Sequence, residues 1–284
     1  MLNKIYAMDF AFYNTLGTYD FAAQCEMVKE IGYDGIQRAI WDGTRRQEAD
    51  VLATCKEKYG LDVAGIYIVL DLSFPEEHPH NKGILTLLEN IEGCDKIDLA
   101  IRGAGKGIAP SSPLGDAPVT AWLLKALEIC ERRGIDLLLY THIKFWMDQH
   151  SDAIRLCQQI NHPNLGIVVT LPHWYGVDGK NTLGFLSSVY PYARKVHLSG
   201  SRRTPLGWSG IVTAQPLDSG ELDCFAIVGT LKNMGYEGMF GYLGWDDGGD
   251  PYIKLKRSYD ALRDMIKRAD EHPHWTSHIY SPSD

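Results

Sequence analysis

The chain has 284 residues, of which 45% are hydrophobic and 23% are charged, and 28 basic against 36 acidic residues give it a formal net charge of −8. This composition is that of a soluble globular protein and excludes disordered and fibrous classes. The negative charge argues against non-specific binding to nucleic acid or to an anionic membrane. No apolar run reaches the ~18 residues of a membrane span, and the opening MLNKIYAMDFAFYN is a poor secretory signal, because Asp9 interrupts a short apolar run.

The cysteines are widely spaced and form no CxxC pair, whereas an extracellular disulfide framework would be denser and in a smaller chain. We therefore expect reduced thiols, most of them in helices, and a cytoplasmic protein. The residues are Cys25, Cys55, Cys94, Cys130, Cys157 and Cys224.

Short apolar runs rich in Ile, Val, Leu and Tyr recur along the chain and are typical of strands buried on both faces. In chain order these predicted strands lie at 5–8, 35–37, 63–69, 97–101, 137–140, 166–170, 195–198 and 239–243. Each is followed by a helical pattern, near 19–31, 44–59, 81–93, 118–133, 149–160, 180–189, 222–234 and 251–269. Glycines end several of these helices, as in KEIGYDGIQ and ERRGIDLLLY, because glycine accepts the left-handed conformation.

Polar residues predict where some helices begin. Asp148 or Ser151 is expected to cap the fifth helix and Asp223 the seventh. The acidic stretch 246–250 is expected to cap the last helix, whose Pro251 suits a first turn.

Eight strands, each followed by a helix, predict an α/β protein with a (β/α)8 TIM barrel over residues 1–270 as a single domain. An irregular polar tail is expected over 271–284. The alternative is a doubly wound open sheet, which normally carries GxGxxG after its first strand. The nearest string, GAGKG at 103–107, lacks that spacing.

Active sites of such barrels lie at the carboxyl ends of the strands. Polar and aromatic residues there suit a small sugar, whose hydroxyls pair with polar groups while its C–H face stacks on rings. Arg102 presents a fork that could clamp a carboxylate or phosphate, with a structural salt bridge as the alternative. The predicted substrate-binding residues are Gln37, Arg102, Trp174, Gln215 and Trp245.

Three histidines, His142, His173 and His197, follow the fifth, sixth and seventh predicted strands. Because neighbouring parallel strands lie about 4.8 Å apart, we expect the three to converge. Three neutral imidazoles would hold a divalent transition metal with open positions. The alternative is metal-free catalysis, with His142 or His173 as acid and base and Tyr140 as a hydrogen donor.

The stretch QPLDSGELDCFAIVGTLKNMGYEGMFGYL (215–243) resembles the closing section of the xylose-isomerase-like sugar isomerase and epimerase superfamily. The resemblance covers essentially the whole chain. It implies a TIM barrel that holds a divalent metal, often Mn, Mg, Co or Zn, on a Glu, an Asp, a His and a second Glu at successive strand ends. It also implies proton transfer beside a carbonyl through an enediolate.

The sequence departs from that pattern at the metal ligands. The usual ExH motif is Tyr140-Thr141-His142, the usual DxxH is Thr170-Leu171-Pro172-His173, and the last Glu is replaced by Leu243; only His197 is kept. Neither Thr170 nor Leu243 compensates the charge of a dication. A two-carboxylate mechanism therefore cannot run at the inherited positions, and a relocated carboxylate base is sought at Asp9, Asp71, Asp246 or Asp247.

The sequence thus predicts a carbohydrate-active isomerase or epimerase, or a lyase, acting on a small keto or aldo sugar or sugar acid, with either a rebuilt metal site or none. The alternative is a catalytically inactive sugar-binding or partner subunit. An apurinic-site endonuclease is disfavoured because the carboxylate-rich metal cluster and the basic face are missing. Neither nucleic acid nor membrane is an expected partner, and aromatics in the loops and tail suggest a homo-oligomer.

Overall fold

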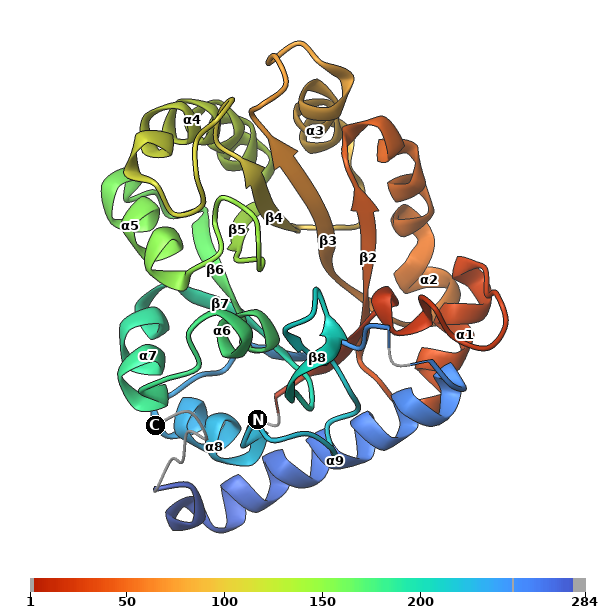
Figure 1. The fold of residues 1–284 in the computed structure, drawn as a ribbon. Helices are drawn as coiled ribbons and strands as arrows, with labels where there is room; N and C mark the ends of the chain where they lie inside the picture. Colours follow the sequence, from red (N-terminus) through yellow and green to blue (C-terminus); the bar gives the residue numbers. More distant parts are fainter. Residues whose placement is uncertain (1–2, 247, 278–284) are drawn as a thin grey trace. The chain divides into compact units, whose positions relative to one another are not determined.

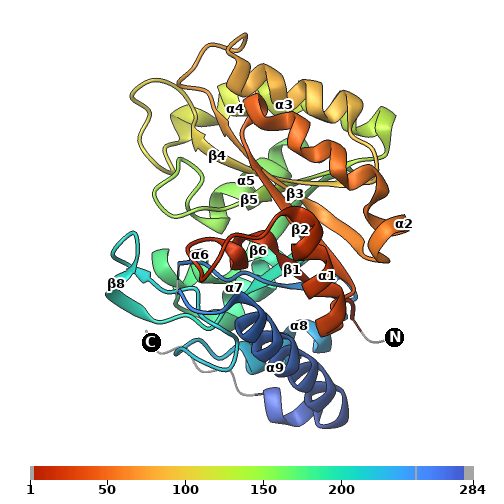
Figure 2. The ribbon, with the colours of Figure 1, turned by 90° about the vertical axis from the view of Figure 1, so that its right-hand side faces the viewer.

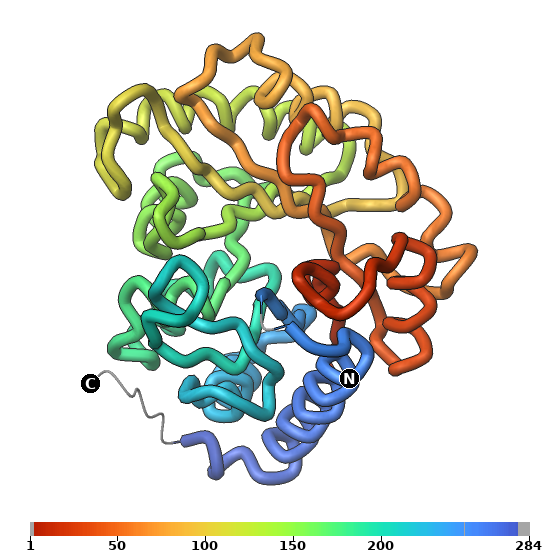
Figure 3. The backbone as a smooth tube through the Cα atoms, turned by 45° about the vertical axis from the view of Figure 1, so that its right-hand side comes forward, coloured from red at the N-terminus to blue at the C-terminus, as the bar shows by residue number. Residues whose placement is uncertain are grey.

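The computed structural model describes residues 3–246 and 248–277. Eight parallel strands close into a barrel in the order β1-β2-β3-β4-β5-β6-β7-β9, which confirms the predicted TIM barrel and excludes the open sheet (Figure 1). The strands are β1 (Ile5–Met8), β2 (Gly35–Trp41), β3 (Asp62–Asp71), β4 (Lys96–Gly103), β5 (Asp136–Tyr140), β6 (Leu165–Thr170), β7 (Ala193–Leu198) and β9 (Met239–Tyr242). Figure 3 traces the chain through these strands and the helices between them.

Packing within the chain defines two compact units. The first unit comprises Met1–Ile36, Thr170–Pro191 and Lys195–Asp284, and the second unit comprises Gln37–Val169 with Tyr192–Arg194.

The first unit carries η1 (Asp9–Phe12), α1 (Phe21–Ile31), α6 (Leu171–Val177), α7 (Thr182–Val189), α8 (Cys224–Asn233), α9 (Pro251–Glu271) and η5 (Pro273–Thr276). The long helix α9 packs beside α8 and α1 (Figure 2). Asp223 accepts a hydrogen bond from the Ala226 N–H and so caps α8 as predicted. Asp250, in the predicted acidic stretch, caps α9 in the same way ahead of Pro251.

Two elements of the first unit were not predicted. Helix α6 begins directly after β6, where a loop was expected, and Pro172 lies in its first turn. The long segment after β7 contains a further strand, β8 (Arg203–Trp208), which makes isolated antiparallel bridges to Val212. Sequence periodicity misses both elements because each is short and partly polar.

The second unit carries η2 (Gly43–Thr54), α2 (Cys55–Tyr59), α3 (Pro79–Asn90), η3 (Pro113–Gly115), α4 (Asp116–Arg133) and α5 (His150–Ile160). The single helix predicted over 44–59 is mostly a 3-10 helix with one α-helical turn or so at its end. The start of η2 packs closely against α3 because Gly43 has no side chain: a Cβ there would lie 2.6 Å from the Gly83 Cα of α3.

The cap predicted for the fifth helix was wrong. Gln149 is the N-cap residue of α5, and it forms a capping box with Asp152. Asp148 instead accepts a hydrogen bond from the Ser111 hydroxyl, and Ser151 lies within the first turn.

The tail begins with η5, where Thr276 is 1% exposed and fills the space beside Gly229 of α8. The remainder of the predicted tail, residues 278–284, lies outside the described residues. All six cysteines are free thiols, five of them buried. In the part of the chain that the structure describes, no helix is long and apolar enough to cross a membrane.

Candidate functional site

Two tyrosines of the second unit lie on strands β3 and β5. Tyr67 of β3 is opposite Asp98 of β4, and Tyr140 ends β5 opposite Ala100. Residues opposite each other in a parallel pair project to the same side, and Asp98 and Ala100 are two apart, so these side chains share one face. The two rings make an edge contact with centroids 4.8 Å apart, and Tyr67 makes a second edge contact with Trp41.

Burial fixes the protonation state of both phenols. Burial and the nearby Asp98 raise the pKa of Tyr67, although Arg102 acts in the opposite direction. Burial, followed by Tyr67 and Asp98, raises the pKa of Tyr140. Both tyrosines therefore keep their protons at neutral pH, when a phenol can donate a hydrogen bond to an oxygen that gains negative charge.

His142 lies just beyond β5 and stacks on Phe145 with ring centroids 3.8 Å apart. Its Nδ1 is 2.9 Å from the Ile143 carbonyl oxygen. Because a carbonyl only accepts, Nδ1 carries the proton and Nε2 carries the lone pair. Burial lowers the pKa of His142 to about 4, so the imidazole is neutral at pH 7.

Gln37 of β2 lies inside the second unit with no exposed surface. Its Nε2 donates to Asp98 Oδ2 over 2.7 Å, and Asp98 is equally buried. Gln37 was predicted to bind substrate, and its contact with Asp98 shows that it also supports a buried carboxylate. Asp98 was not predicted, because a single acidic residue inside an apolar strand gives no motif.

Arg102 is the last residue but one of β4, and its side chain is 45% exposed. Its Nε donates to Asp71 Oδ2 over 2.7 Å, and the Asp71 side chain is only 8% exposed. Burial opposes ionisation of Asp71, but hydrogen bonds from Ser73 and Arg102 outweigh it and lower the pKa of this carboxyl. The salt bridge foreseen as an alternative for Arg102 is thus present.

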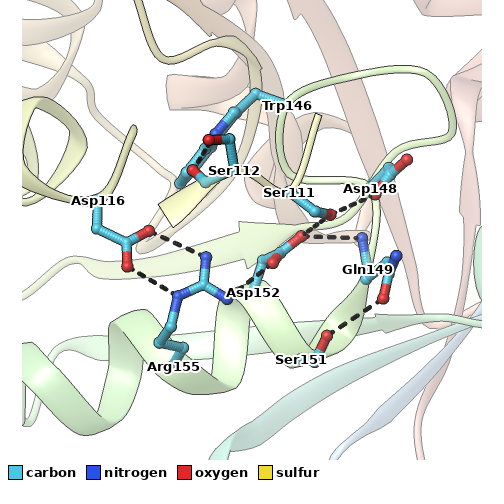
Figure 4. A network of polar contacts seen from close by, with 9 residues as sticks. All are labelled: Ser111, Ser112, Asp116, Trp146, Asp148, Gln149, Ser151, Asp152 and Arg155. Carbon is cyan, nitrogen blue, oxygen red and sulfur yellow. Dashed lines mark hydrogen bonds and ion pairs between the residues drawn. The ribbon is translucent and has the colours of Figure 1, made fainter. Parts of the chain in front are cut away.

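A polar network joins the loops that follow β4 and β5 (Figure 4). The Ser111 hydroxyl lies 2.8 Å from Asp148 Oδ1 and 2.6 Å from Asp152 Oδ2. Arg155 of α5 holds Asp152 and also pairs with both oxygens of Asp116 on α4. These bonds hold the two loops together next to Arg102 and His142. Trp146 in the second loop also donates its backbone N–H to the Arg102 carbonyl, which ties this loop to the end of β4.

In the first unit, His197 of β7 is fully buried against Tyr6 of β1, with ring centroids 5.7 Å apart. Lys195 lies two residues earlier on the same strand, and its Nζ is 5.4 Å from the centre of the Tyr6 ring. Burial, together with the Lys195 charge, lowers the pKa of His197 well below its ordinary value. His197 is therefore neutral, and neither Tyr6 nor Lys195 was predicted to surround it.

His173 lies in the first turn of α6 and makes an edge contact with Trp208 of β8. Arg203 of β8 binds the Tyr175 carbonyl through Nε and Nη2, so the segment after β7 is fastened to α6. Trp174 is 3% exposed and stacks on Phe185 of α7 with centroids 4.4 Å apart. One face of the Trp174 ring is therefore occupied by helix packing, and its predicted contact with substrate stays a prediction.

The remaining predicted residues of the first unit lie on loops. Trp245 packs against the rings of Phe10 and Tyr13, and Gln215 pairs through its backbone with Gly200. Asp246 is exposed and accepts a hydrogen bond from Asn14. Asp247, the other candidate for a relocated base, lies outside the described residues.

The positions at which the family resemblance implies metal ligands do not fit a divalent cation. They hold the protonated phenol of Tyr140, the buried hydroxyl of Thr170, the imidazole of His197 and the hydrocarbon of Leu243. Across residues 3–246 and 248–277, no group of three or more His, Cys, Asp or Glu side chains is placed to hold a metal ion. His142 belongs to the second unit and His173 and His197 to the first, so a metal site built from the three stays a prediction.

Three solved structures show the fold that this chain shares. They are a 3-keto-D-glucoside 4-epimerase, YcjR, from E. coli (TM-score 0.72, 21% identity, 92% of this chain and 99% of that one), an L-ribulose 3-epimerase (0.76, 14%, 99% and 100%), and the IOLI protein with a bound zinc atom (0.72, 15%, 94% and 99%). No curated protein matches the sequence significantly. The model of the xylose isomerase-like TIM barrel family matches residues 25–271, which confirms the resemblance, and the chain belongs to this family.

Proposed function

We propose that this protein is a carbohydrate-active isomerase or epimerase, acting on a small keto or aldo sugar or sugar acid at the carboxyl ends of its barrel strands. Membership of the family supports the proposal, as do structural neighbours described as epimerases of a keto-glucoside and of ribulose. The observation that carries it is the group Tyr67, Tyr140 and His142, which joins two protonated phenols to a neutral imidazole.

This group supplies the two functions that proton transfer beside a carbonyl needs. The Tyr140 phenol donates a hydrogen bond to the carbonyl oxygen as negative charge develops there. His142 Nε2 accepts the proton from the neighbouring carbon and, in an isomerisation, returns it to the other carbon, whereas an epimerisation needs a second proton donor, such as water, on the opposite face. A lyase would share the first of these steps and then expel a hydroxide or alkoxide as water or alcohol. No step is assigned to a metal, because the inherited ligand positions do not fit one.

Exchange of substrate C–H for deuterium in D2O tests the proposal across a panel of pentoses, hexoses and their keto forms. Tyr140→Phe keeps the ring contact with Tyr67 and removes the hydroxyl, so exchange should slow by about 10² or more. The control is Tyr236→Phe, which removes another buried phenol that donates to the Met239 carbonyl in the first unit. Equal exchange rates in Tyr140→Phe and the unmodified protein would remove Tyr140 from the reaction.

A second function, binding a sugar without turning it over, is favoured by one observation. The three positions that carry carboxylates in the family carry Tyr140, Thr170 and Leu243. Ligand-dependent thermal stabilisation without any deuterium exchange would establish this alternative. Elemental analysis of the purified protein, repeated on His142→Ala and His197→Ala, tests the predicted three-histidine metal site independently of activity.

A further inference from the structure

The hydrogen bond that holds the Arg102 side chain uses only one of the N–H groups of its guanidinium. The contact with Asp71 is made through Nε alone, and the Arg102 side chain makes no other hydrogen bond or ion pair with any residue in 3–246 and 248–277. The two Nη atoms form the end of the guanidinium, and their parallel N–H groups match the two oxygens of a carboxylate. The half-exposed side chain thus presents an unused fork.

Asp71 fixes the direction of this fork. Its Oδ1 accepts from the Ser73 N–H and hydroxyl, while Oδ2 accepts from Arg102. Asn81 holds the Asp71 backbone by bonding both its N–H and its carbonyl. Gly103 makes room for the arrangement, because a Cβ there would lie 2.4 Å from Asp71 Oδ1. Such restraint lowers the entropy cost of binding an anion.

Arg102 follows Ala100, the residue opposite Tyr140, by two positions on β4, which places it at the same strand ends as the group assigned to catalysis. The Arg102 charge acts on the Tyr67 phenol, which contacts Tyr140, and also on the His80 ring. Besides Asp71, the carboxylates around these residues are Asp98, which acts on Tyr67, and Asp42, 3.7 Å from His80 Nδ1. One guanidinium among these carboxylates suits a monoanion with two oxygens better than a phosphate dianion, which needs more donors.

We infer that the substrate is a sugar acid whose carboxylate binds the two Nη atoms of Arg102, while its carbonyl end reaches the Tyr67–Tyr140 pair. This inference rests on the proposed function for the reaction, and it adds the chemical class of the substrate. Arg102 is then a specificity residue, and Asp71 is a positioning residue that acts through it.

Calorimetric titration with matched ligands tests the inference: D-glucuronate, D-galacturonate and D-gluconate, the neutral sugars D-glucose and D-galactose, and D-glucose 6-phosphate. At least one acid should bind more tightly than its neutral counterpart. Arg102→Gln should weaken that binding tenfold or more and change neutral-sugar binding less than twofold. Arg102→Lys keeps the charge without the fork and should fall between. Arg132→Gln is the matched control, because it removes a half-exposed arginine, paired with Glu89, from helix α4 of the same unit.

Arg102→Gln leaves Asp71 without its ion-pair partner, so circular dichroism accompanies each titration. If that variant does not fold, Arg102→Gln combined with Asp71→Asn removes both charges and should give the same selective loss. Acids that bind no better than neutral sugars, or a preference for the phosphate, would overturn the inference and leave the proposed isomerase intact. Acid binding that depends on Arg102 without deuterium exchange would support the inference and contradict the proposed reaction.

Discussion

At the scale of single residues, the barrel strands carry polar side chains whose chemistry is set by what surrounds them. Tyr67 and Tyr140 stay protonated and His142, which is half-buried, stays neutral, because removal from water disfavours the charged form of each side chain. Asp98 is fully buried too, and Gln37 donates a hydrogen bond to it. Removing such a donor from a buried carboxylate lowers the stability of the folded state by more than the net contribution of an ordinary hydrogen bond, because water cannot replace the lost donor there.

Gln37→Leu should therefore lower the free energy of unfolding by about 1–3 kcal/mol, measured by urea denaturation at pH 7. Gln37→Glu is the matched variant, because it places a second carboxyl within 2.7 Å of Asp98. The two carboxyls cannot both ionise at that distance, so this variant should be the less stable of the two at pH 7 and should recover as the pH falls. A Gln37→Leu protein as stable as the parent would show that the bond to Asp98 is dispensable.

Some residues of the candidate site could be predicted from the sequence, and others could not. Gln37, Arg102, Tyr140 and the three histidines could be named because each lies at or just beyond the carboxyl end of a predicted strand in a barrel. Asp98 and Tyr6 could not, because each is one residue within an apolar run and only the register of the sheet shows what it faces. A salt bridge of Arg102 was foreseen as an alternative, but its partner Asp71 is 31 positions away, and only the fold identifies it.

At the scale of elements, strands β1 and β9 fit together because one of them lacks a side chain at the point of contact. Gly241 lies opposite both Tyr6 and His197 in the parallel register. A Cβ at Gly241 would lie 2.2 Å from the Tyr6 ring, far inside van der Waals contact. The glycine thus lets the Tyr6 ring lie over the strand and reach His197.

Gly241→Ala should destabilise the protein by about 1–3 kcal/mol through overpacking, measured by thermal and urea denaturation. Tyr6→Leu alone should also be destabilising, because it leaves a cavity. In the double variant the smaller leucine side chain at position 6 makes room for the alanine at position 241. The stability lost by the double variant should therefore be less than the sum of the losses of the two single variants. Strict additivity would contradict direct contact between these positions.

At the scale of the whole molecule, several buried imidazoles make stability depend on pH. Burial lowers the pKa of His150 to about 3 and that of His142 to about 4, and burial also lowers the pKa of His197. In the unfolded chain these groups gain protons near pH 6.5, whereas in the folded protein they do not until the pH is far lower. The unfolded state therefore binds more protons below pH 6.5, and the folded state loses stability as the pH falls toward 4.

Unfolding in urea at pH 7 and pH 5 measures this effect. His150 is 4% exposed, and its contribution to the loss over that interval should be about 2 kcal/mol. His150→Gln should reduce the difference between the two pH values by that amount, whatever its effect at pH 7. His162→Gln is the control, because this histidine has a side chain that is 20% exposed and lies 3.8 Å from a Glu131 oxygen. A difference that is unchanged in His150→Gln would mean that this residue titrates normally.

From residue order alone the sequence predicts the eightfold alternation of strand and helix and the ends of several helices, because these follow from local periodicity, capping and glycine placement, and it indicates the family through the resemblance of residues 215–243. It also determined that the inherited metal ligands are replaced, because that is a matter of residue identity. The fold adds that Arg102 is held by its Nε, that Asp98 shares one face with Tyr67 and Tyr140, and that His142 and His197 are neutral. Those properties depend on burial and on contacts between strands far apart in the chain, and residue order alone does not contain them.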